Sequence, residues 1–361
     1  MKYFIVVFTL ILIGAIRKQS KLVFWGLYFV LFFIAVNYSE GRDLRVYEGG
    51  YEQPFINVED DVMYRSTLWG FFMMFSNYIG LSFSHFRVLC FLIWSIPIFY
   101  FIKKFAKYPT WVAATALLFP LLQFSSQMRN GVAMAFVYLG LSILLSLNNS
   151  KGKWIFLAFL FFAGLLHNGV YFYGLGVLAL FPRIKTKTLL FVVLLFVSTS
   201  VFLIESGLFS YVITVLFGDY YAARYFSEFE GLFYWKNVPL TIGIFINLWF
   251  TYRAAKLSRR NTCIESNSTM DFSLFVLRFN IIMLAAIPLM AFSNHFFRIF
   301  QNAYILSIIS IANATFICRG VNSLQGNILR KEYFIFYLLL VTGFFTMMDG
   351  GYVDFWSSIS F

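Results

Sequence analysis

Twelve strongly apolar segments follow one another along this chain, and they limit its possible folds more than any other feature. They lack the apolar–polar alternation over about ten residues that marks the strands of a membrane β-barrel, so helices are expected. Several are shorter than the roughly 20 residues that a perpendicular helix needs to cross a bilayer, and we expect the helices to extend beyond them. The segments cover residues 3–16, 22–38, 86–102, 109–124, 131–147, 153–166, 170–181, 188–204, 237–254, 272–291, 298–318 and 333–347.

The composition agrees with burial in lipid rather than in a water-soluble core. Hydrophobic residues make up 60% of the chain and charged residues 12%, whereas a soluble domain carries roughly 25% charged residues. Backbone polar groups inside a bilayer must be satisfied within helices or a closed barrel. We therefore predict an all-α polytopic integral membrane protein with about 12 transmembrane helices, forming a single membrane domain over residues 1–361.

Basic residues predict the orientation of these spans, because every second loop along the chain is basic. Six such loops hold 18 of the 28 lysines and arginines but only three of the 16 acids. The positive-inside rule places them in the cytoplasm, so both termini are expected on the periplasmic or extracellular side. A basic face against anionic membrane lipid accounts for the net charge of +12, and no nucleic-acid partner is expected. The basic loops are residues 17–21, 103–107, 151–153, 183–187, 253–271 and 319–332.

Two of the outward loops are long, at about 39–85 and 205–236. The first contains an amphipathic stretch at residues 62–80, which we expect to lie flat at the interface or to fold into the mouth of a cavity. Neither loop is large enough for a soluble domain. Function is therefore expected within the membrane or at its outer surface.

Arginines are frequent on the side predicted to face outward. The planar guanidinium is suited to forked contacts with phosphate or carboxylate, and an ionisable residue away from a basic cytoplasmic loop is a functional candidate. Their number suggests an anionic ligand, with diphosphate a natural one. They are Arg42, Arg45, Arg65, Arg87, Arg129, Arg224 and Arg298.

The strongest local pattern is the pentapeptide QMRNG at residues 127–131, where one span is expected to turn into the next. Its two amides, Gln127 and Asn130, together with the glycine favour a tight polar turn that presents Arg129 to a ligand. An arginine at the end of a span can also simply snorkel to the surface.

His167 is the second local candidate, because it closes an apolar run that should end at the same outer surface. A histidine there can act as a general base, hydrogen-bond a sugar hydroxyl or cap a helix. The His167–Gly169 interruption favours a turn over one bent element across residues 153–181.

Further candidates come from the remaining outward positions. Arg224 and Tyr225 lie in an aromatic loop whose tyrosines can stack on sugar rings, and Asp219 in the same loop is a candidate base. No metal-ligand cluster or phosphate-binding glycine loop is found, so no metal and no cofactor are expected. The catalytic candidates are His167, Arg129 and Asp219, and the substrate-binding candidates are Arg298, Arg224, Gln127, Asn130, Arg65, Arg87 and Tyr225.

Three stretches of the sequence resemble the EpsG/Wzy-type family of bacterial polysaccharide polymerases. The first is FSSQMRNGVAMAFVYLGLSILL followed by FLAFLFFAGLLHNGVYFYGLGVLAL, in which Arg129 and His167 flank one helical hairpin. The others are YRSTLWGFFMMFSNYIGLSFSHFRVLCFLIW with its basic KKFAK turn, and FFRIFQNAYILSI. The resemblance covers most of the chain in topology and is most specific over about residues 127–180.

The resemblance implies a glycosyltransferase of the bacterial cytoplasmic (inner) membrane, with a topology like that of GT-C-type lipid-donor glycosyltransferases. Such proteins transfer a growing glycan from undecaprenyl diphosphate to a single lipid-linked repeat unit outside the membrane, which builds O-antigen, capsule or exopolysaccharide. Arginines would hold the leaving diphosphate without a metal, and His167 or Asp219 would orient or deprotonate the attacking hydroxyl. A chain-length regulator protein is a possible partner.

Two alternatives stay open beside polymerisation. A lipid-linked glycan ligase would use similar arginines and differ only in its acceptor. A flippase or exporter of lipid-linked glycans should show paired repeats and ionisable residues near the midplane of the membrane. The sequence shows no convincing repeat, and the charged residues outside the basic cytoplasmic loops crowd the outer face, which favours an enzyme.

Overall fold

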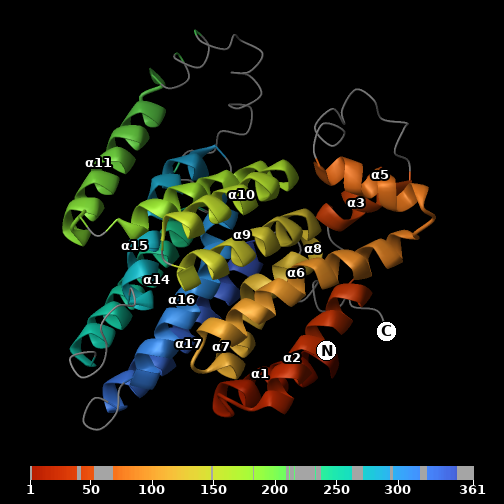
Figure 1. Ribbon diagram of the computed structural model, residues 1–361, viewed down its shortest axis with the longest axis horizontal. Coiled ribbons are helices and arrows are strands. Elements are labelled where there is room, and N and C mark those ends of the chain that lie inside the picture. The colour runs from red at the N-terminus through yellow and green to blue at the C-terminus, as the bar shows by residue number, and fades with distance from the viewer. Residues whose placement is uncertain are drawn as a thin grey trace. The chain divides into compact units, whose positions relative to one another are not determined.

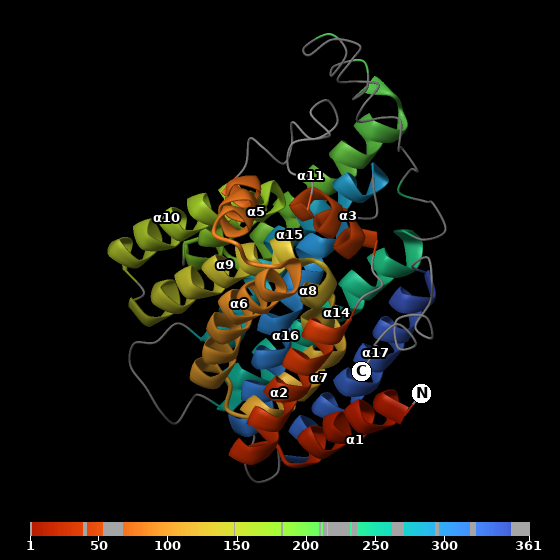
Figure 2. The ribbon, with the colours of Figure 1, turned by 90° about the vertical axis from the view of Figure 1, so that its right-hand side faces the viewer.

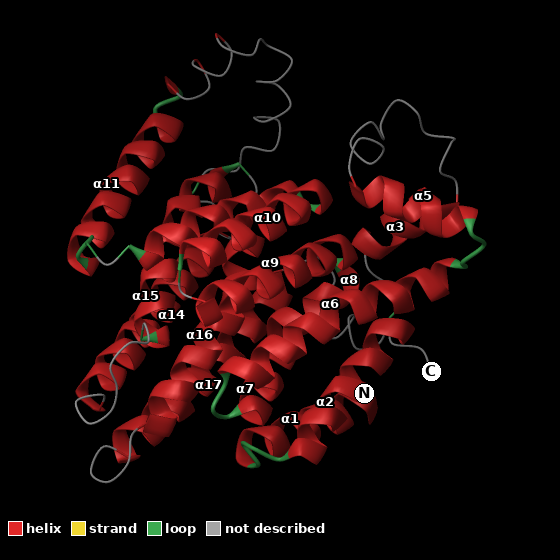
Figure 3. Ribbon diagram, in the orientation of Figure 1, coloured by secondary structure: helices red, strands yellow, loops and turns green. Residues whose placement is uncertain are grey.

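Helices make up every secondary-structure element that the structure describes (Figure 3). A computed structural model describes residues 2–38, 42–52, 68–147, 149–181, 183–208, 211, 215, 232, 237–261, 271–292, 296–317 and 323–347. The all-α prediction is therefore confirmed for these ranges.

Each of the twelve apolar segments coincides with helical structure, and several helices extend beyond the segment as expected. In chain order the helices are α1 (Lys2–Ile16), α2 (Lys21–Asn37), α3 (Arg42–Glu52), α5 (Leu68–Tyr78), α6 (Phe83–Phe105), α7 (Pro109–Ala116), the π-helical turn η1 (Leu117–Leu121), α8 (Leu122–Ser126), α9 (Met128–Leu147), α10 (Ser150–Leu166), the 3-10 helix η2 (Asn168–Leu180), α11 (Thr186–Glu205), α14 (Asn237–Asn261), α15 (Phe272–Met283), the 3-10 helix η4 (Leu284–Ala291), α16 (Phe297–Ile317) and α17 (Ser323–Met347).

Five helical stretches of the described chain are long and apolar enough to cross a membrane. This agrees with a multi-pass membrane protein, whereas the number of twelve spans, their orientation and the GT-C-like topology stay predictions. The five are Phe83–Phe105, Met128–Leu147, Thr186–Glu205, Phe272–Ala291 and Phe297–Phe316, and shorter apolar helices cover Val7–Ile16, Lys21–Asn37 and Asn168–Leu180.

The chain forms two compact units. Unit 1 comprises Met1–Gly174 together with Phe334–Phe361, and unit 2 comprises Leu175–Tyr333. The main helices of unit 1 lie side by side, with α9 between α6 and α10 (Figures 1 and 2).

Ring and hydrogen-bond contacts fix the direction in which α6 and α9 run. The rings of Phe101 and Tyr138 are 4.9 Å apart, and Lys104 Nζ donates to Ser142 Oγ over 3.2 Å. The partner on α9 is 37 or 38 positions later in both pairs, so the two helices are parallel. Their starts, which carry Arg87 and Arg129 respectively, therefore lie toward the same end of unit 1.

The expected span 109–124 is interrupted rather than continuous. The backbone of Phe119 is extended, with φ −170° and ψ 130°, between α7 and α8. Its carbonyl oxygen is not left unsatisfied, because the Tyr337 hydroxyl of α17 donates to it. Pro120, which follows, has no N–H to offer to a helical hydrogen bond.

The amphipathic stretch of the first outward loop is described from Leu68 onward, as α5. One face of α5 buries Trp69 and Met73, and the other exposes Phe71, Phe75 and Tyr78. The helix packs on α3 and α10, so one aromatic face is held by the bundle while the other stays open. An exposed aromatic face beside a buried one is typical of a helix at a membrane interface.

Unit 2 is built around α14, α15 and α16. A buried polar layer joins them, because Asn247 Nδ2 donates to Ser307 Oγ over 3.2 Å and Asn280 Nδ2 donates to the same hydroxyl over 3.1 Å. The Tyr333 hydroxyl completes the layer with a 2.9 Å hydrogen bond to Asn247 Oδ1. Buried polar groups must find such partners, and this layer fixes the register of the three helices.

Candidate functional site

The chain reverses direction at Gln127, which separates α8 from α9. Its backbone is non-helical, with φ −95° and ψ 56°, and its carbonyl accepts the Gly131 N–H over 2.9 Å. A Cβ on Gly131 would lie 3.1 Å from Phe124 Cβ and 3.2 Å from the Trp94 ring. Only glycine allows this approach without displacement, so the predicted tight turn is confirmed and Arg129 lies in the first turn of α9.

A row of buried amides lies under this turn. Gln127 Nε2 donates to Gln123 Oε1 over 3.3 Å, and Asn130 Nδ2 donates to Gln127 Oε1 over 3.2 Å. All three side chains are buried. Gln127 and Asn130 were predicted as ligand contacts, and the structure shows them bonded to the protein, where they hold the backbone that carries Arg129.

The hairpin of α9 and α10 brings Arg129 and His167 to the same level. The two helices are antiparallel, since a Cβ on Gly140 would meet Phe156 at 3.0 Å while Phe136 lies 6.3 Å from Phe159. Arg129 precedes Gly140 by eleven positions and His167 follows Phe156 by eleven. At 1.5 Å per residue both lie about 16 Å from that contact, to within about one helical turn.

His167 occupies the turn that ends α10. Its backbone is extended, with φ −152° and ψ 107°, and its N–H donates to the Ala163 carbonyl over 2.9 Å. The following helix η2 folds back, because Gly164 lies against the Tyr171 ring and Gly174 against Leu160. The predicted turn is confirmed, and the His167 side chain is half-buried at the end of the hairpin that the charge pattern predicts to face outward.

Arg87, at the start of α6, has partners within unit 1. Its guanidinium donates to the carbonyl oxygens of Ala35, over 2.7 Å, and Tyr38. These carbonyls belong to the last turn of α2 and to its C-cap. Carbonyl groups at the end of a helix have no hydrogen-bond donor within the helix. The arginine thus caps α2, and contact with a substrate stays a prediction.

Unit 2 contains a second polar layer besides the layer of Asn247, Asn280 and Ser307. The polar side chains of this second layer, Thr241 and Gln301, have no hydrogen bonds among the described residues. The Gln301 side chain is fully buried, and neither of its amide atoms has a hydrogen-bond partner among the described residues. The same holds for Thr241 Oγ1.

Asn237 bonds to Met290 and Asn247 to Asn280, so α14 runs antiparallel to α15, and α16 follows α15 in the chain and packs on it. We infer that α14 and α16 are parallel. Thr241 and Gln301 each lie six positions before the bonded pair Asn247 and Ser307 and are therefore at about the same level.

Arg298 lies one turn from Gln301, in the first turn of α16, and is half-buried. The sequence pattern identified Arg298 but gave no signal for Thr241, since a threonine in an apolar helix is ordinary. Because Arg298 belongs to unit 2 and Arg129 to unit 1, their convergence on one ligand stays a prediction.

Four predicted site residues, Arg65, Asp219, Arg224 and Tyr225, lie outside the described residues. Within the described ranges, no three histidine, cysteine, aspartate or glutamate side chains are grouped as metal ligands.

Comparison with known proteins gives one family. The model described as the EpsG family matches residues 20–356, which is nearly the whole chain. Comparisons with curated proteins and with solved structures gave no match.

Proposed function

Because the chain belongs to the EpsG family, we propose that it polymerises undecaprenyl-diphosphate-linked oligosaccharide repeat units into O-antigen or a related surface polysaccharide. Family membership across residues 20–356 supports polysaccharide polymerase activity in general. The specific site is the hairpin of α9 and α10, where Arg129 and His167 end at one level. The reaction takes place at the outer face of the cytoplasmic membrane.

Arg129 is the diphosphate ligand in this proposal. A leaving diphosphate gains charge as the glycosidic bond breaks, and a guanidinium held in place stabilises that charge in the transition state. The buried amide row Gln123–Gln127–Asn130 supports this role, because it fixes the turn from which Arg129 projects. Preorganisation of this kind is what electrostatic stabilisation requires.

His167 is the group that receives or orients the acceptor hydroxyl. The hydroxyl oxygen bonds to the anomeric carbon of the donor glycan, and the bond from that carbon to the diphosphate oxygen breaks with its electron pair. The proton of the hydroxyl passes to the imidazole, since histidine is the side chain most often used for proton transfer near neutral pH. Undecaprenyl diphosphate is released as the other product.

The test uses a strain deleted for this gene, in which surface polysaccharide is separated by electrophoresis after complementation. Wild type is expected to restore a ladder, whereas Arg129→Ala and His167→Ala are expected to leave one repeat unit. Loss of one oxyanion-type contact costs about 100- to 1,000-fold in rate. Arg17→Ala is the matched control, since Arg17 is an exposed arginine of the basic loop 17–21, on the side predicted to face the cytoplasm, and should support a normal ladder.

Membrane abundance of each variant is measured beside the ladder. A full ladder in the deletion strain, or the absence of even the single-unit product, would show that polymerisation is the wrong step. The exporter or the ligase alternative would then take its place. Normal ladders from well-expressed Arg129→Ala and His167→Ala would reject the site while leaving the activity intact.

A further inference from the structure

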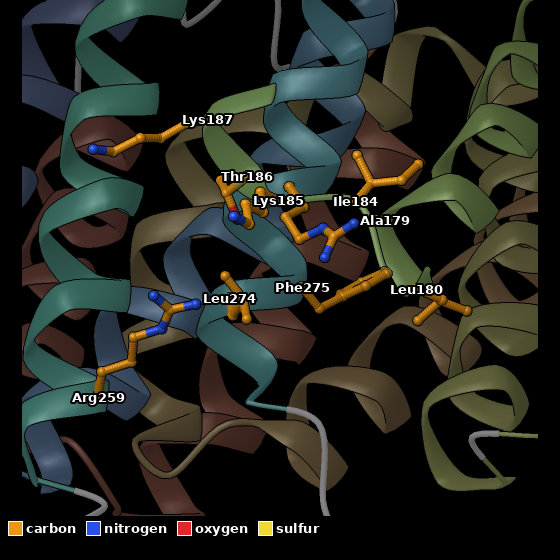
Figure 4. Close-up of a pocket in the computed structure, with 10 residues that line it drawn as sticks. Ala179, Leu180, Ile184, Lys185, Thr186, Lys187, Arg259, Leu274 and Phe275 are labelled. Atoms are coloured by element: carbon orange, nitrogen blue, oxygen red, sulfur yellow. The ribbon is translucent and has the colours of Figure 1, made fainter. Parts of the chain in front are cut away.

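A cavity of about 420 Å³ lies in unit 2, between the start of α11, the end of α14 and the start of α15 (Figure 4). Its volume falls in the range of roughly 300–1,000 Å³ that is usual for ligand pockets. Its lining includes residues of two basic segments, 183–187 and 253–271, whose charge predicts the cytoplasmic side. The proposed polymerase site, in contrast, is predicted at the outer face.

Four cationic side chains line this cavity, and the described lining residues include no acid. Lys185 and Lys187 come from the start of α11, Arg259 from α14 and Arg278 from α15. Figure 4 shows Lys187 reaching toward the helix that carries Arg259. Since three helices contribute charge to one hollow, the cavity concentrates positive potential where an anion can enter.

Arg278 is the most informative of the four, because it is only 5% exposed. One terminal nitrogen donates to the Phe181 carbonyl over 2.6 Å, while the buried Nε has no hydrogen-bond partner in the described structure. No described carboxylate lies within ion-pair distance of it. Buried charges are normally paired with an opposite charge, so a buried guanidinium that lines a cavity with one neutral carbonyl partner and an unbonded Nε indicates an anionic ligand.

The N-terminus of α11 contributes further donors at the same place. This 20-residue helix starts at Thr186, which lines the cavity, and no side chain caps its first N–H groups. Free N–H groups and the helix dipole favour a negative group at such an end, phosphate above all.

The rest of the cavity wall is apolar, which favours a lipid as the ligand over a free inorganic anion. Leu180, Ile184, Leu274 and Phe275 line the cavity beside the cations. Further along α11 large apolar side chains such as Phe191 and Leu195 are exposed, at 67% and 57%. An acyl chain can follow such a surface, whereas inorganic phosphate gains nothing from it.

We propose that this cavity binds the phosphodiester headgroup of an anionic phospholipid through the lining cations Arg278, Lys187 and Arg259. Basic pockets between helices on the cytoplasmic side of membrane proteins suit such headgroups. The proposal concerns lipid binding alone and does not depend on polymerase activity.

The test is native mass spectrometry of the full-length protein in detergent, titrated with phosphatidylglycerol or phosphatidylcholine. Arg259→Gln is expected to weaken phosphatidylglycerol binding about fivefold, since one basic contact contributes about 1 kcal/mol. Lys256→Gln is the matched control, because Lys256 is exposed on the same helix but does not line the cavity. Arg278→Gln should weaken phosphatidylglycerol binding more than Arg259→Gln does. If Arg278→Gln does not fold, Arg259→Gln still tests the proposal.

Three results would overturn the proposal. Equal phosphatidylglycerol affinities of Arg259→Gln and Lys256→Gln would place the lipid elsewhere. Equal binding of phosphatidylcholine and phosphatidylglycerol would show that the cations do not select an anionic headgroup. Displacement of phosphatidylglycerol by inorganic phosphate at equal concentration would identify a soluble anion as the ligand. Because none of these measurements involves glycan synthesis, failure here leaves the polymerase proposal untouched.

Discussion

Gly131 is the residue on which the polar turn at the start of α9 depends, and Gly131→Ala tests this directly. A Cβ at this position would lie 3.1 Å from Phe124 Cβ and 3.2 Å from two atoms of the Trp94 ring. Real Cβ atoms are rarely this close to neighbours, so either α8 or α6 must shift by a few tenths of an ångström. Overpacking of this kind costs about 1–3 kcal/mol.

The same substitution at Gly26 supplies the control. Gly26 lies inside α2, and a Cβ there would have no heavy atom within 4 Å. Gly26→Ala should therefore gain the helix propensity of alanine, which is worth about 0.8–1 kcal/mol. Gly131→Ala gains part of that preference and loses more to the clash, so the two variants should differ by about 1–3 kcal/mol.

Thermal unfolding in detergent, followed by helical circular dichroism, measures the difference, and the polysaccharide ladder measures its effect on the site. We expect Gly26→Ala to melt at or above the wild-type temperature with a normal ladder. Gly131→Ala should melt lower and shorten the ladder, because the clash moves the turn that carries Arg129. Identical melting curves and ladders for the two variants would refute the close approach of α6, α8 and α9.

Two further predictions concern the polar layers of unit 2. Tyr333→Phe removes the hydrogen bond to Asn247 Oδ1 and should lower stability by about 0.5–1.5 kcal/mol in the same melting assay; an unchanged curve would show that the bond contributes nothing. Gln301→Leu replaces a fully buried amide that has no described partner, so it should raise the melting temperature while weakening polymerisation, as expected of a polar residue kept for function. A lower melting temperature for Gln301→Leu would instead assign that amide a structural role.

The two layers differ in hydrogen bonding although the polar atoms of both are buried. In the layer of Asn247, Asn280 and Ser307 the side chains satisfy one another across three helices. About 1.7 helical turns away, Thr241 and Gln301 are at about the same level and have no hydrogen bonds among the described residues. Leaving such groups unsatisfied is costly, and proteins most often tolerate that cost at sites that receive a ligand.

The helical class and the positions of the helices follow from local features of the amino-acid sequence. Twelve apolar segments predicted where helices lie, because backbone groups in lipid must bond within their own segment and the apolar run is therefore a local signal. The turns at Gln127 and His167 were also predictable, since amides, histidine and glycine interrupt the runs locally. The same local chemistry made Arg129 and His167 candidates.

The contacts of those side chains depend on how the helices pack against one another. It showed that Arg87 caps α2, because the carbonyls of Ala35 and Tyr38 are some 50 positions away in the sequence. It aligned Thr241 with Gln301 and gathered Lys185, Arg259 and other cations around one cavity. Packing between helices sets their register and brings together side chains from distant segments. No local pattern in an apolar chain encodes that packing.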